Sequence, residues 1–276
     1  METCPGNCAT CAEKDNCSNV IEKAKANELS HIKKIIGVLS GKGGVGKSFV
    51  TASLATYLNR MGHKVGILDA DITGPSIPKA FGIKEKAVGE EQYIFPRETI
   101  GGIKVISSNM LLQNESDPII WRGSLVSNLV TQFFENVAWG ELDVLLIDMP
   151  PGTGDVALTI FQSLPIDQVV VVTSPQDLVS LIVSKALKMA EMMTIPIIGV
   201  IENMSYLICP KCEERIPIFG ASHLGAFAKE RKFNILGKLP LNSENTQLMD
   251  KGAIEKINLP EMGVIAKTIS GELKNA

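Results

Sequence analysis

The chain has 276 residues, of which 45% are hydrophobic and 21% are charged. This is the composition of a globular protein with a sizeable core, and a prior of roughly 150 residues per domain predicts one or two domains. The formal charge of −3 and the lack of a long basic run argue against broad nucleic-acid binding. No apolar stretch reaches the roughly 18–20 residues that span a bilayer, and no signal-peptide pattern opens the chain. We therefore expect a cytoplasmic protein with neither nucleic acid nor membrane as a partner.

Residues 1–30 form a polar, cysteine-rich segment with a helical-looking stretch over 21–28. We expect this segment to be an appendage without a core of its own. It contains four of the six cysteines, namely Cys4, Cys8, Cys11 and Cys17. In a reducing compartment such clusters are more often metal or cluster ligands than disulfides.

Short apolar runs alternate with amphipathic segments over residues 31–276. The runs are rich in β-branched residues and apolar throughout, which is typical of parallel strands covered on both faces. They occupy residues 35–39, 65–68, 144–147, 169–172, 197–201 and 235–236. Apolar residues between them recur at helical spacing, as over 50–61 and 179–193. This order predicts one doubly wound α/β domain with a mostly parallel sheet. Residues 91–107 indicate instead a small hairpin inserted after the second strand.

A glycine-rich loop follows the first predicted strand and opens a helix. It fits the phosphate-loop pattern Gly-x-x-x-x-Gly-Lys-Ser/Thr in the required strand–loop–helix context. Backbone N–H groups of such a loop converge on phosphate oxygens, and the helix N-terminus adds positive potential. The loop consists of Gly41, Lys42, Gly43, Gly44, Val45, Gly46, Lys47 and Ser48. We expect Lys47 to contact the β- and γ-phosphates and Ser48 to bind Mg²⁺. The alternative is an accidental glycine-rich turn.

Acidic residues follow two further predicted strands. Asp71 comes shortly after the second strand, and we expect it to orient the attacking water, with a helix-capping role near Ser76 as the alternative. Asp148 follows four apolar residues in a Walker B pattern and is expected to hold Mg²⁺ directly or through water. Gly152 is placed to offer its N–H to the γ-phosphate, as a switch loop does.

The phosphate loop resembles the deviant Walker A motif of the MinD/ParA and nitrogenase-iron-protein class of dimeric ATPases. The resemblance implies that Lys42 acts across the dimer on the phosphates of the partner. From spacing alone, a solvated loop charge is the alternative. The same resemblance puts Asn203 at the adenine position, and no guanine-binding Asn-Lys-x-Asp motif occurs. ATP is therefore the expected nucleotide.

Cys209 and Cys212 form an isolated pair shortly after the fifth predicted strand. A zinc site or a cubane cluster needs about four protein ligands, so the pair is incomplete within one chain. The missing ligands must come from the N-terminal cysteines or from a symmetry mate. Two pairs facing each other in a twofold dimer supply four thiolates, enough for one bridging 4Fe–4S cluster. A redox disulfide, half of a zinc site and inert thiols are the alternatives.

The motifs in this order resemble the Mrp/ApbC family of iron–sulfur cluster carrier ATPases. They are the phosphate loop, Asp69-Ala-Asp-Ile-Thr-Gly-Pro-Ser76, Asp148-Met-Pro-Pro-Gly-Thr-Gly-Asp155, Glu202-Asn-Met-Ser205 and Cys209-Pro-Lys-Cys212. The resemblance implies a homodimer whose cysteine pair passes a labile bridging cluster to apo-proteins, coupled to slow, Mg²⁺-dependent ATP hydrolysis.

The N-terminal motif is similar to the cluster segment of the eukaryotic cytosolic scaffold members, although its first gap is shorter. A 4Fe–4S cluster is its expected occupant, and zinc, disulfides and disorder are the alternatives. Two other functions stay open for the whole chain. One is a MinD/ParA-like positioning ATPase, and the other is an ATP-driven electron-transfer protein with a bridging cluster.

Overall fold

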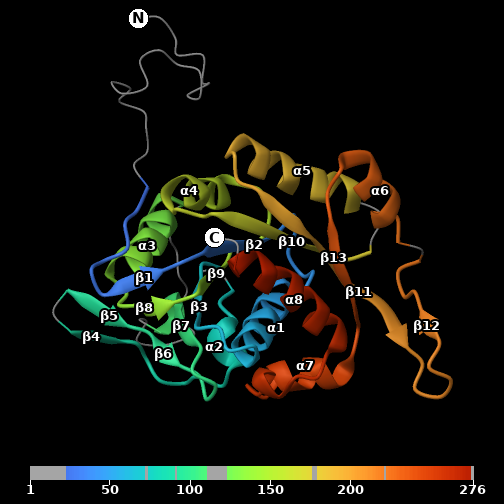
Figure 1. Ribbon diagram of the computed structural model, residues 1–276, viewed down its shortest axis with the longest axis horizontal. Coiled ribbons are helices and arrows are strands. Elements are labelled where there is room, and N and C mark those ends of the chain that lie inside the picture. Colours follow the sequence, from blue (N-terminus) through green and yellow to red (C-terminus); the bar gives the residue numbers. More distant parts are fainter. Residues whose placement is uncertain are drawn as a thin grey trace, which may run out of the picture.

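The computed structural model describes residues 23–71, 74–90, 92–110, 123–175, 179–220 and 222–274, and its described part is built on a nine-stranded sheet (Figure 1). The strand order is β12-β11-β10-β2-β9-β3-β7-β6, with β13 beside β11. The bounds are β2 Ile35–Ser40, β3 Val65–Asp69, β6 Arg97–Glu98, β7 Lys104–Ser107, β9 Val144–Asp148, β10 Gln168–Thr173, β11 Ile197–Ile208, β12 Arg215–Ile216 and β13 Ile235–Pro240. Neighbouring strands are parallel except in the pairs β6–β7 and β11–β12.

Helices cover both faces of this sheet. One face carries α3 (Gly123–Asn136), α4 (Asp155–Ser163), α5 (Val179–Met192) and α6 (Leu224–Arg231), which lie above the sheet in Figure 1. The other carries α1 (Lys47–Arg60), α2 (Ile77–Ala80), α7 (Ser243–Asp250) and α8 (Pro260–Lys274). Two short 3-10 helices, η3 (Ser108–Met110) and η4 (Ile254–Lys256), complete the list of described helices.

Each central strand contributes side chains to the hydrophobic core on both faces of the sheet, because successive side chains point to opposite faces. On β2, Ile35 and Leu39 join the core under α3–α5, whereas Ile36 and Val38 join the core under α1 and α8. The same alternation runs through β9 and β10. This two-sided burial explains why the runs are apolar throughout, and it confirms the predicted doubly wound fold.

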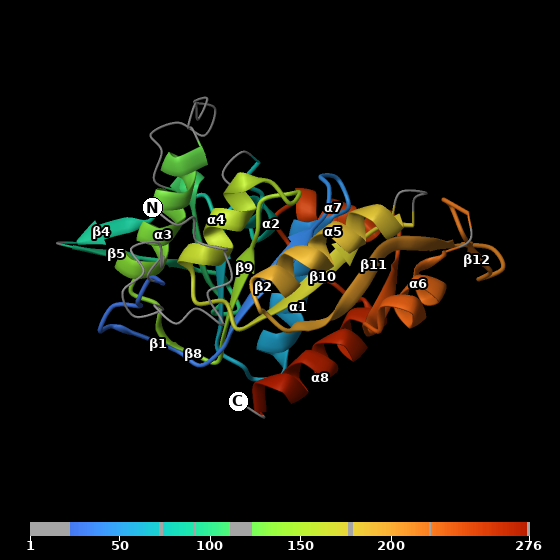
Figure 2. The same ribbon diagram turned by 90° about the horizontal axis from the view of Figure 1, so that it is seen from above.

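Two small pairs lie outside the main sheet. Strand β1 (Ser30–Ile32) runs parallel to β8 (Gly140–Leu142), and β4 (Val88–Glu90) pairs antiparallel with β5 (Tyr93–Phe95). Figure 2 shows the β4–β5 hairpin and the β11–β12 hairpin at opposite ends of the molecule.

The expectation of a separate small hairpin over 91–107 is wrong in part. Strand β6 does turn back on β7, but β7 is a strand of the main sheet and pairs in parallel with β3. Its side chains Val105 and Ile106 are fully buried, one in each core layer, so burial on both faces draws this short strand into the sheet.

The helix expected over 21–28 is absent from its described part, residues 23–28. The Asn27 side chain donates to the carbonyl oxygens of Glu135 and Val137 and accepts from the N–H of Leu29. Such side-chain bonds compete with helix formation. Ala24 is buried, and its N–H donates to the Ser163 carbonyl oxygen, 2.7 Å away. The division into 1–30 and 31–276 stays a prediction.

In the described part of the chain, no helix is both long and apolar enough to cross a membrane. The last helix, α8, packs Ile265 and Ile269 fully into the core beside α1, as its four-residue spacing predicts. Strand β2 lies between β10 and β9, and the carboxyl ends of these parallel strands share one edge of the sheet. In open α/β folds this edge is where ligands bind.

Candidate functional site

The loop between β2 and α1 borders a pocket of about 340 Å³ at the carboxyl edge of the sheet. Gly44 and Gly46 both have φ of +80°, a left-handed conformation that residues with a side chain rarely adopt. A Cβ at Gly46 would also collide with Nδ2 of Asn203. Helix α1 has no side-chain cap, and Lys47 and Ser48 in its first turn line the pocket. An uncapped helix N-terminus behind a glycine-rich loop binds anions, as the sequence predicts.

The Walker B aspartate lies directly against this first turn. Asp148 ends β9 and is fully buried, with Oδ2 2.8 Å from the Lys47 ammonium. Ser48 donates a 2.6 Å hydrogen bond to the same oxygen, and Thr51 donates one of 2.6 Å to Oδ1. The structure therefore brings together the lysine, serine and aspartate predicted from separate motifs. Thr51 was not predicted. Its position one turn after Lys47 on the same helix face was the available signal.

Two buried polar groups in this pocket fit a phosphate ligand. The Lys47 side chain is only 5% exposed, yet Nζ makes no hydrogen bond of good geometry within the described part of the chain. The Ser40 hydroxyl is also buried without a partner among the described residues, and it too lines the pocket. Buried polar atoms are rarely left unsatisfied, so these groups and the loop N–H groups fit phosphate oxygens. The Ser48 and Asp148 oxygens are the hard ligands that Mg²⁺ prefers.

A second carboxyl group, which sequence reasoning did not single out, lies next to Asp148. Asp69 ends β3, where it pairs with Asp148 in the sheet register, and it is fully buried. Burial, and then the nearby Asp148 carboxylate, raise the pKa of Asp69 to about 8. Its oxygens accept from the N–H of Asp71 and of Ile77 and from the Ser107 hydroxyl. Asp69 thus holds the start of the loop that carries Asp71 and the first turn of α2.

The other residues expected near the γ-phosphate differ in their contacts within the protein. Asp71 lines the pocket with Oδ2 4.0 Å from Lys47 Nζ. Gly152 has φ of +87°, but its N–H donates to the Ser40 carbonyl oxygen, 2.9 Å away. A contact between this N–H and a γ-phosphate therefore requires that bond to break. Lys42 is half-buried near the start of the loop. The roles of Asp71, Gly152 and Lys42 stay predictions.

The far end of the pocket is closed by β11 and α7. Asn203 is buried, and its Nδ2 donates to the Val45 carbonyl oxygen, 2.9 Å away. This bond leaves a second N–H and the amide oxygen, which suit the donor and acceptor edge of adenine. Met204, Thr246 and Met249 complete this end. The two α7 residues were missed, although α7 follows β13, whose carboxyl end lies at the same edge of the sheet.

Cys209 and Cys212 lie in the turn of the β11–β12 hairpin, which projects beyond the sheet (Figures 1 and 2). Both thiols are free; Cys212 is exposed and Cys209 partly so. Backbone N–H groups of Lys211 and of Cys212 bond to the Cys209 sulfur and, with the Cys212 side chain, lower the pKa of the Cys209 thiol. Favouring the thiolate makes Cys209 a better nucleophile and metal ligand. In the described ranges no third His, Cys, Asp or Glu joins the pair.

An apolar collar surrounds the cysteine turn. Its five side chains are large, hydrophobic and about 40% exposed, namely Leu207, Ile208, Ile216, Ile218 and Phe219. Five large apolar side chains exposed on one short hairpin are typical of an interaction site.

The base of the hairpin, by contrast, is firmly anchored. The Tyr206 hydroxyl donates to Glu261 of α8, 2.8 Å away, and the Arg215 guanidinium lies 4.7 Å above the Tyr206 ring. Burial, followed by the Glu261 bond, raises the pKa of Tyr206 to about 12. The four N-terminal cysteines, Cys4, Cys8, Cys11 and Cys17, lie outside the described residues.

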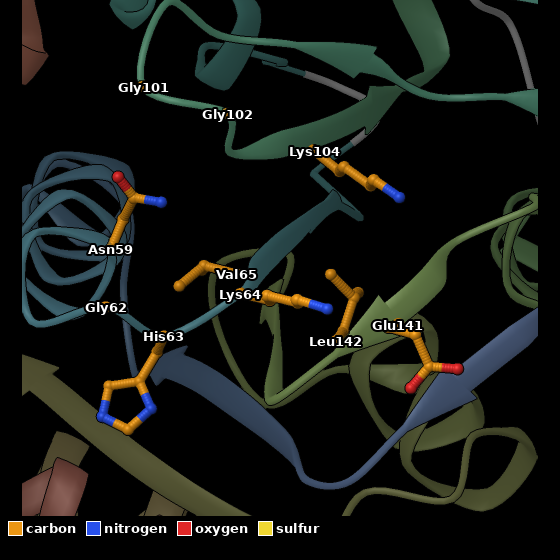
Figure 3. Close-up of a pocket in the computed structure, with 10 residues that line it drawn as sticks. All are labelled: Asn59, Gly62, His63, Lys64, Val65, Gly101, Gly102, Lys104, Glu141 and Leu142. Carbon is orange, nitrogen blue, oxygen red and sulfur yellow. The ribbon is translucent and has the colours of Figure 1, made fainter.

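A second hollow, of about 480 Å³, lies at the amino ends of β3 and β7, away from the phosphate loop (Figure 3). Lys64, Lys104 and Glu141 line it, and His63 points away from the other labelled side chains. The Lys104 ammonium is already bonded to the Trp139 carbonyl oxygen, 2.8 Å away. The hollow shares no residue with the predicted site.

Comparison with known proteins identifies the family. A ParA-group family model, described as NUBPL iron-transfer P-loop NTPase, matches residues 31–271. The chain belongs to this family. It is 44% identical over 268 residues to the iron–sulfur cluster carrier protein of Clostridium perfringens, covering 91% of this chain and 94% of that protein. It is 48% identical over 260 residues to the carrier protein of Methanocaldococcus jannaschii, covering 91% and 90%.

Solved structures agree with this assignment. The nucleotide-binding protein of Archaeoglobus fulgidus in complex with ADP matches with a TM-score of 0.74 and 43% identity, over 82% of this chain and 88% of that one. The Pyrococcus furiosus cell division ATPase MinD matches with a TM-score of 0.62 over 87% and 99%, at an identity of 20% that supports the fold alone. The predicted family and fold are therefore confirmed, and this NUBPL-family member is a P-loop ATP hydrolase.

Proposed function

We propose that this NUBPL-family protein holds an iron–sulfur cluster between two copies of itself and passes it to apo-proteins, under the control of MgATP. The observation that carries the proposal is the cysteine turn. Cys212 is exposed and Cys209 partly so, both thiols are free, and backbone N–H groups lower the pKa of Cys209, in the turn that follows the strand lining the nucleotide pocket. The carrier names of the relatives support the same function.

In the nucleotide pocket the chain supplies three kinds of group. The loop N–H groups and Lys47 bind the β- and γ-phosphates, and Asn203 contacts the base. Ser48 and Asp148 would hold Mg²⁺, whose charge would offset that of the phosphates. Asp71 accepts a hydrogen bond from the attacking water, and Lys42 of each protomer reaches the phosphates of the other. The Gly152 N–H gives up its hydrogen bond to the Ser40 carbonyl oxygen and donates to a γ-phosphate oxygen instead.

At the cysteine turn two protomers together supply what one lacks. Cys209 and Cys212 from each copy provide four thiolates related by a twofold axis, which suffices for one 4Fe–4S cluster. The apolar collar supports this arrangement, because its five exposed side chains flank, on both sides along the chain, the turn that must meet its symmetry mate. A homodimer is therefore part of the proposal, and the cluster is cargo rather than a resident cofactor.

The N-terminal cysteines are proposed to bind a second 4Fe–4S cluster, with zinc as the competing occupant. Thiolate ligands need reduced cysteines, and cytosolic thiols are kept reduced. A cytoplasmic location is therefore the one we propose.

The test is the iron, acid-labile sulfide and zinc content of four anaerobically reconstituted proteins. They are the wild type, Cys209→Ser/Cys212→Ser, a variant with all four N-terminal cysteines changed to serine, and a variant lacking all six. The N-terminal variant should keep about four irons and four sulfides per dimer, and the hairpin variant should lose that set. The variant lacking all six gives the background.

Transfer is tested separately by mixing the N-terminal variant, loaded with cluster, with an apo-ferredoxin. We expect the cluster to move to the ferredoxin. A cluster that is reducible but stays on the donor would contradict the carrier function and favour electron transfer. Iron and sulfide that do not depend on Cys209 and Cys212, or zinc filling the hairpin site stoichiometrically, would overturn the bridging cluster itself.

A further inference from the structure

We infer that Glu202 is the positioning residue that links the nucleotide pocket to the cysteine hairpin. This inference rests on the proposed function. It identifies the residue through which nucleotide binding affects the cysteine turn. Glu202 lies on β11 and is 1% exposed. Its two carboxylate oxygens bond to three different segments, all of which adjoin the hairpin or the sheet edge that carries it.

The contacts of Glu202 hold both arms of the hairpin. Oε2 accepts a 2.6 Å hydrogen bond from Ser205, which lies on the arm that leads to Cys209. Oε1 accepts a 2.6 Å hydrogen bond from Ser222, in the segment by which the chain returns from the hairpin. The ammonium of Lys238, on β13, lies 3.1 Å from Oε2 and supplies the opposite charge. Bonds to a charged acceptor are the strong ones, so the two arms are joined through one buried carboxylate.

The backbone beside Glu202 forms an irregular segment of β11. The pairing of β11 with β13 runs from Glu202 opposite Lys238 to Tyr206 opposite Pro240, which leaves two extra residues on β11. Met204 lies within this bulge with φ of +56°, in the left-handed region. Such a conformation is unfavourable for a non-glycine residue and persists only where its surroundings enforce it. The Glu202–Ser205 bond spans the bulge and is one of these constraints.

The same bulge touches the phosphate loop. Asn203 donates to the Val45 carbonyl oxygen, and the terminal methyl group of Met204 lies 3.4 Å from where a Cβ on Gly46 would be. A nucleotide that reshapes the loop therefore acts first on Asn203 and Met204. From Met204 the strand runs five residues to Cys209, about 17 Å at the rise of an extended chain. Loop, bulge, carboxylate and hairpin form one continuous set of contacts.

The inference is tested by the alkylation of Cys209 and Cys212 in the apo-protein, with and without a non-hydrolysable MgATP analogue. In the wild type the nucleotide should change the combined alkylation rate by about fivefold or more. In Glu202→Gln, which keeps the shape of the side chain but removes its charge, this ratio should fall to about one. Affinity for the nucleotide analogue, measured by calorimetry, should stay within about twofold of the wild type.

Tyr206→Phe is the matched control. It removes the bond that anchors the hairpin base to α8 but leaves the three Glu202 contacts in place. It should therefore keep the wild-type ratio, whereas a merely structural role predicts that both variants lose the ratio equally. If Glu202→Gln does not fold, Ser222→Ala frees the returning arm at a partly exposed site and should lower the ratio in the same way.

Three results would overturn the inference. They are a wild type without a nucleotide effect on the thiols, a Glu202→Gln variant with the wild-type ratio, and equal losses in Glu202→Gln and Tyr206→Phe. None of them depends on a cluster, so iron and sulfide content measured on the same variants reports separately on the proposed function. Glu202→Gln should load as much iron as the wild type, because the thiol ligands are unchanged.

Discussion

The nucleotide pocket and the cysteine hairpin are built in opposite ways, although β11 contributes to both. The pocket gathers its groups from distant parts of the chain, and its polar side chains, such as Lys47 and Asp148, are buried among mutual contacts. The hairpin carries two thiols three positions apart on one turn and leaves them fully or partly exposed beside five apolar side chains. A single protomer thus brings Lys47, Ser48 and Asp148 together, whereas its two hairpin thiols are by themselves too few for a zinc or cluster site.

The largest expected effect is the loss of ATP hydrolysis in a variant that still binds iron, which would show that the nucleotide pocket and the cysteine hairpin work independently. Lys47→Ala removes the ammonium beside Asp148, and ATP hydrolysis measured by phosphate release should fall to background with loss of nucleotide affinity. Iron content per dimer should stay at the wild-type level, because no thiol is altered. Lys64→Ala, an exposed lysine outside the pocket, is the control. Loss of iron together with hydrolysis would show that the two regions are not independent in loading.

The next effect tests whether the pocket is completed across the dimer. Lys42→Ala should lower hydrolysis by about a thousandfold, the contribution of a cationic residue supplied by a partner, while ADP affinity changes little. Asp71→Asn should also be inactive. When the two variants are mixed, mixed dimers contain one pocket with both an intact Asp71 and a Lys42 from the partner. Activity should therefore return in the mixture, and a mixture as inactive as its components would contradict action across the dimer.

A smaller effect concerns pH and the buried carboxyl group. The folded pKa of Asp69, about 8, exceeds its ordinary value of 3.8, so the folded protein binds this proton more tightly. The free energy of unfolding should therefore fall as pH rises from about 4 to about 8, and Asp69→Asn should remove that fall. The measurement is urea unfolding of the nucleotide-free protein in EDTA at several pH values.

Asp143→Asn provides the control of opposite sign. A hydrogen bond from Lys33 lowers the pKa of Asp143, so its stabilisation is present above its ordinary pKa and is lost as pH falls through the lowered value. Its replacement should leave the fall between pH ~4 and ~8 intact. An Asp69→Asn protein with the wild-type pH profile would show that Asp69 is ionised in the folded state.

The smallest effect lies within the cysteine turn. The N–H bonds to its sulfur lower the pKa of Cys209, so at neutral pH Cys209 should react with iodoacetamide a few times faster than Cys212. Mass spectrometry of the separate peptides gives both rates, and the rate profile of Cys209 should have its midpoint below 9. Equal rates across the pH range would mean that the turn does not prepare a thiolate.

The sequence predicted a feature correctly where that feature depends on neighbouring residues, or on the rule that the carboxyl ends of parallel strands meet at one edge of the sheet. The glycines around Lys47 and the acidic residue after the run 144–147 are contiguous patterns, and parallel strands bring their ends to one edge. Asp69 was passed over because its raised pKa depends on burial and on Asp148, which pairs with it only in the folded sheet. The place of β7 in the sheet likewise depends on a partner strand far away along the chain.

The role inferred for Glu202 was out of reach for the same reason. Glu202 contacts Ser222 and Lys238, which lie 20 and 36 positions further along the chain. No periodic pattern in the sequence predicts these contacts. Strand β11 also extends to Ile208, beyond the predicted run that ended at residue 201. The continuation was missed because it begins with polar side chains, Glu202, Asn203 and Ser205, which are buried although they are not apolar.

The extended course of β11 from its bulge to the cysteine turn limits which insertions the chain can accept. Successive strand residues face opposite sides, so one residue inserted between Met204 and Cys209 would turn the thiols to the opposite face of the hairpin. An insertion beyond Cys212, where the chain turns back, would only lengthen an exposed loop. We therefore expect chimeric proteins to need an unchanged number of residues between Asn203 and Cys209. Residues added after Cys212 should be tolerated.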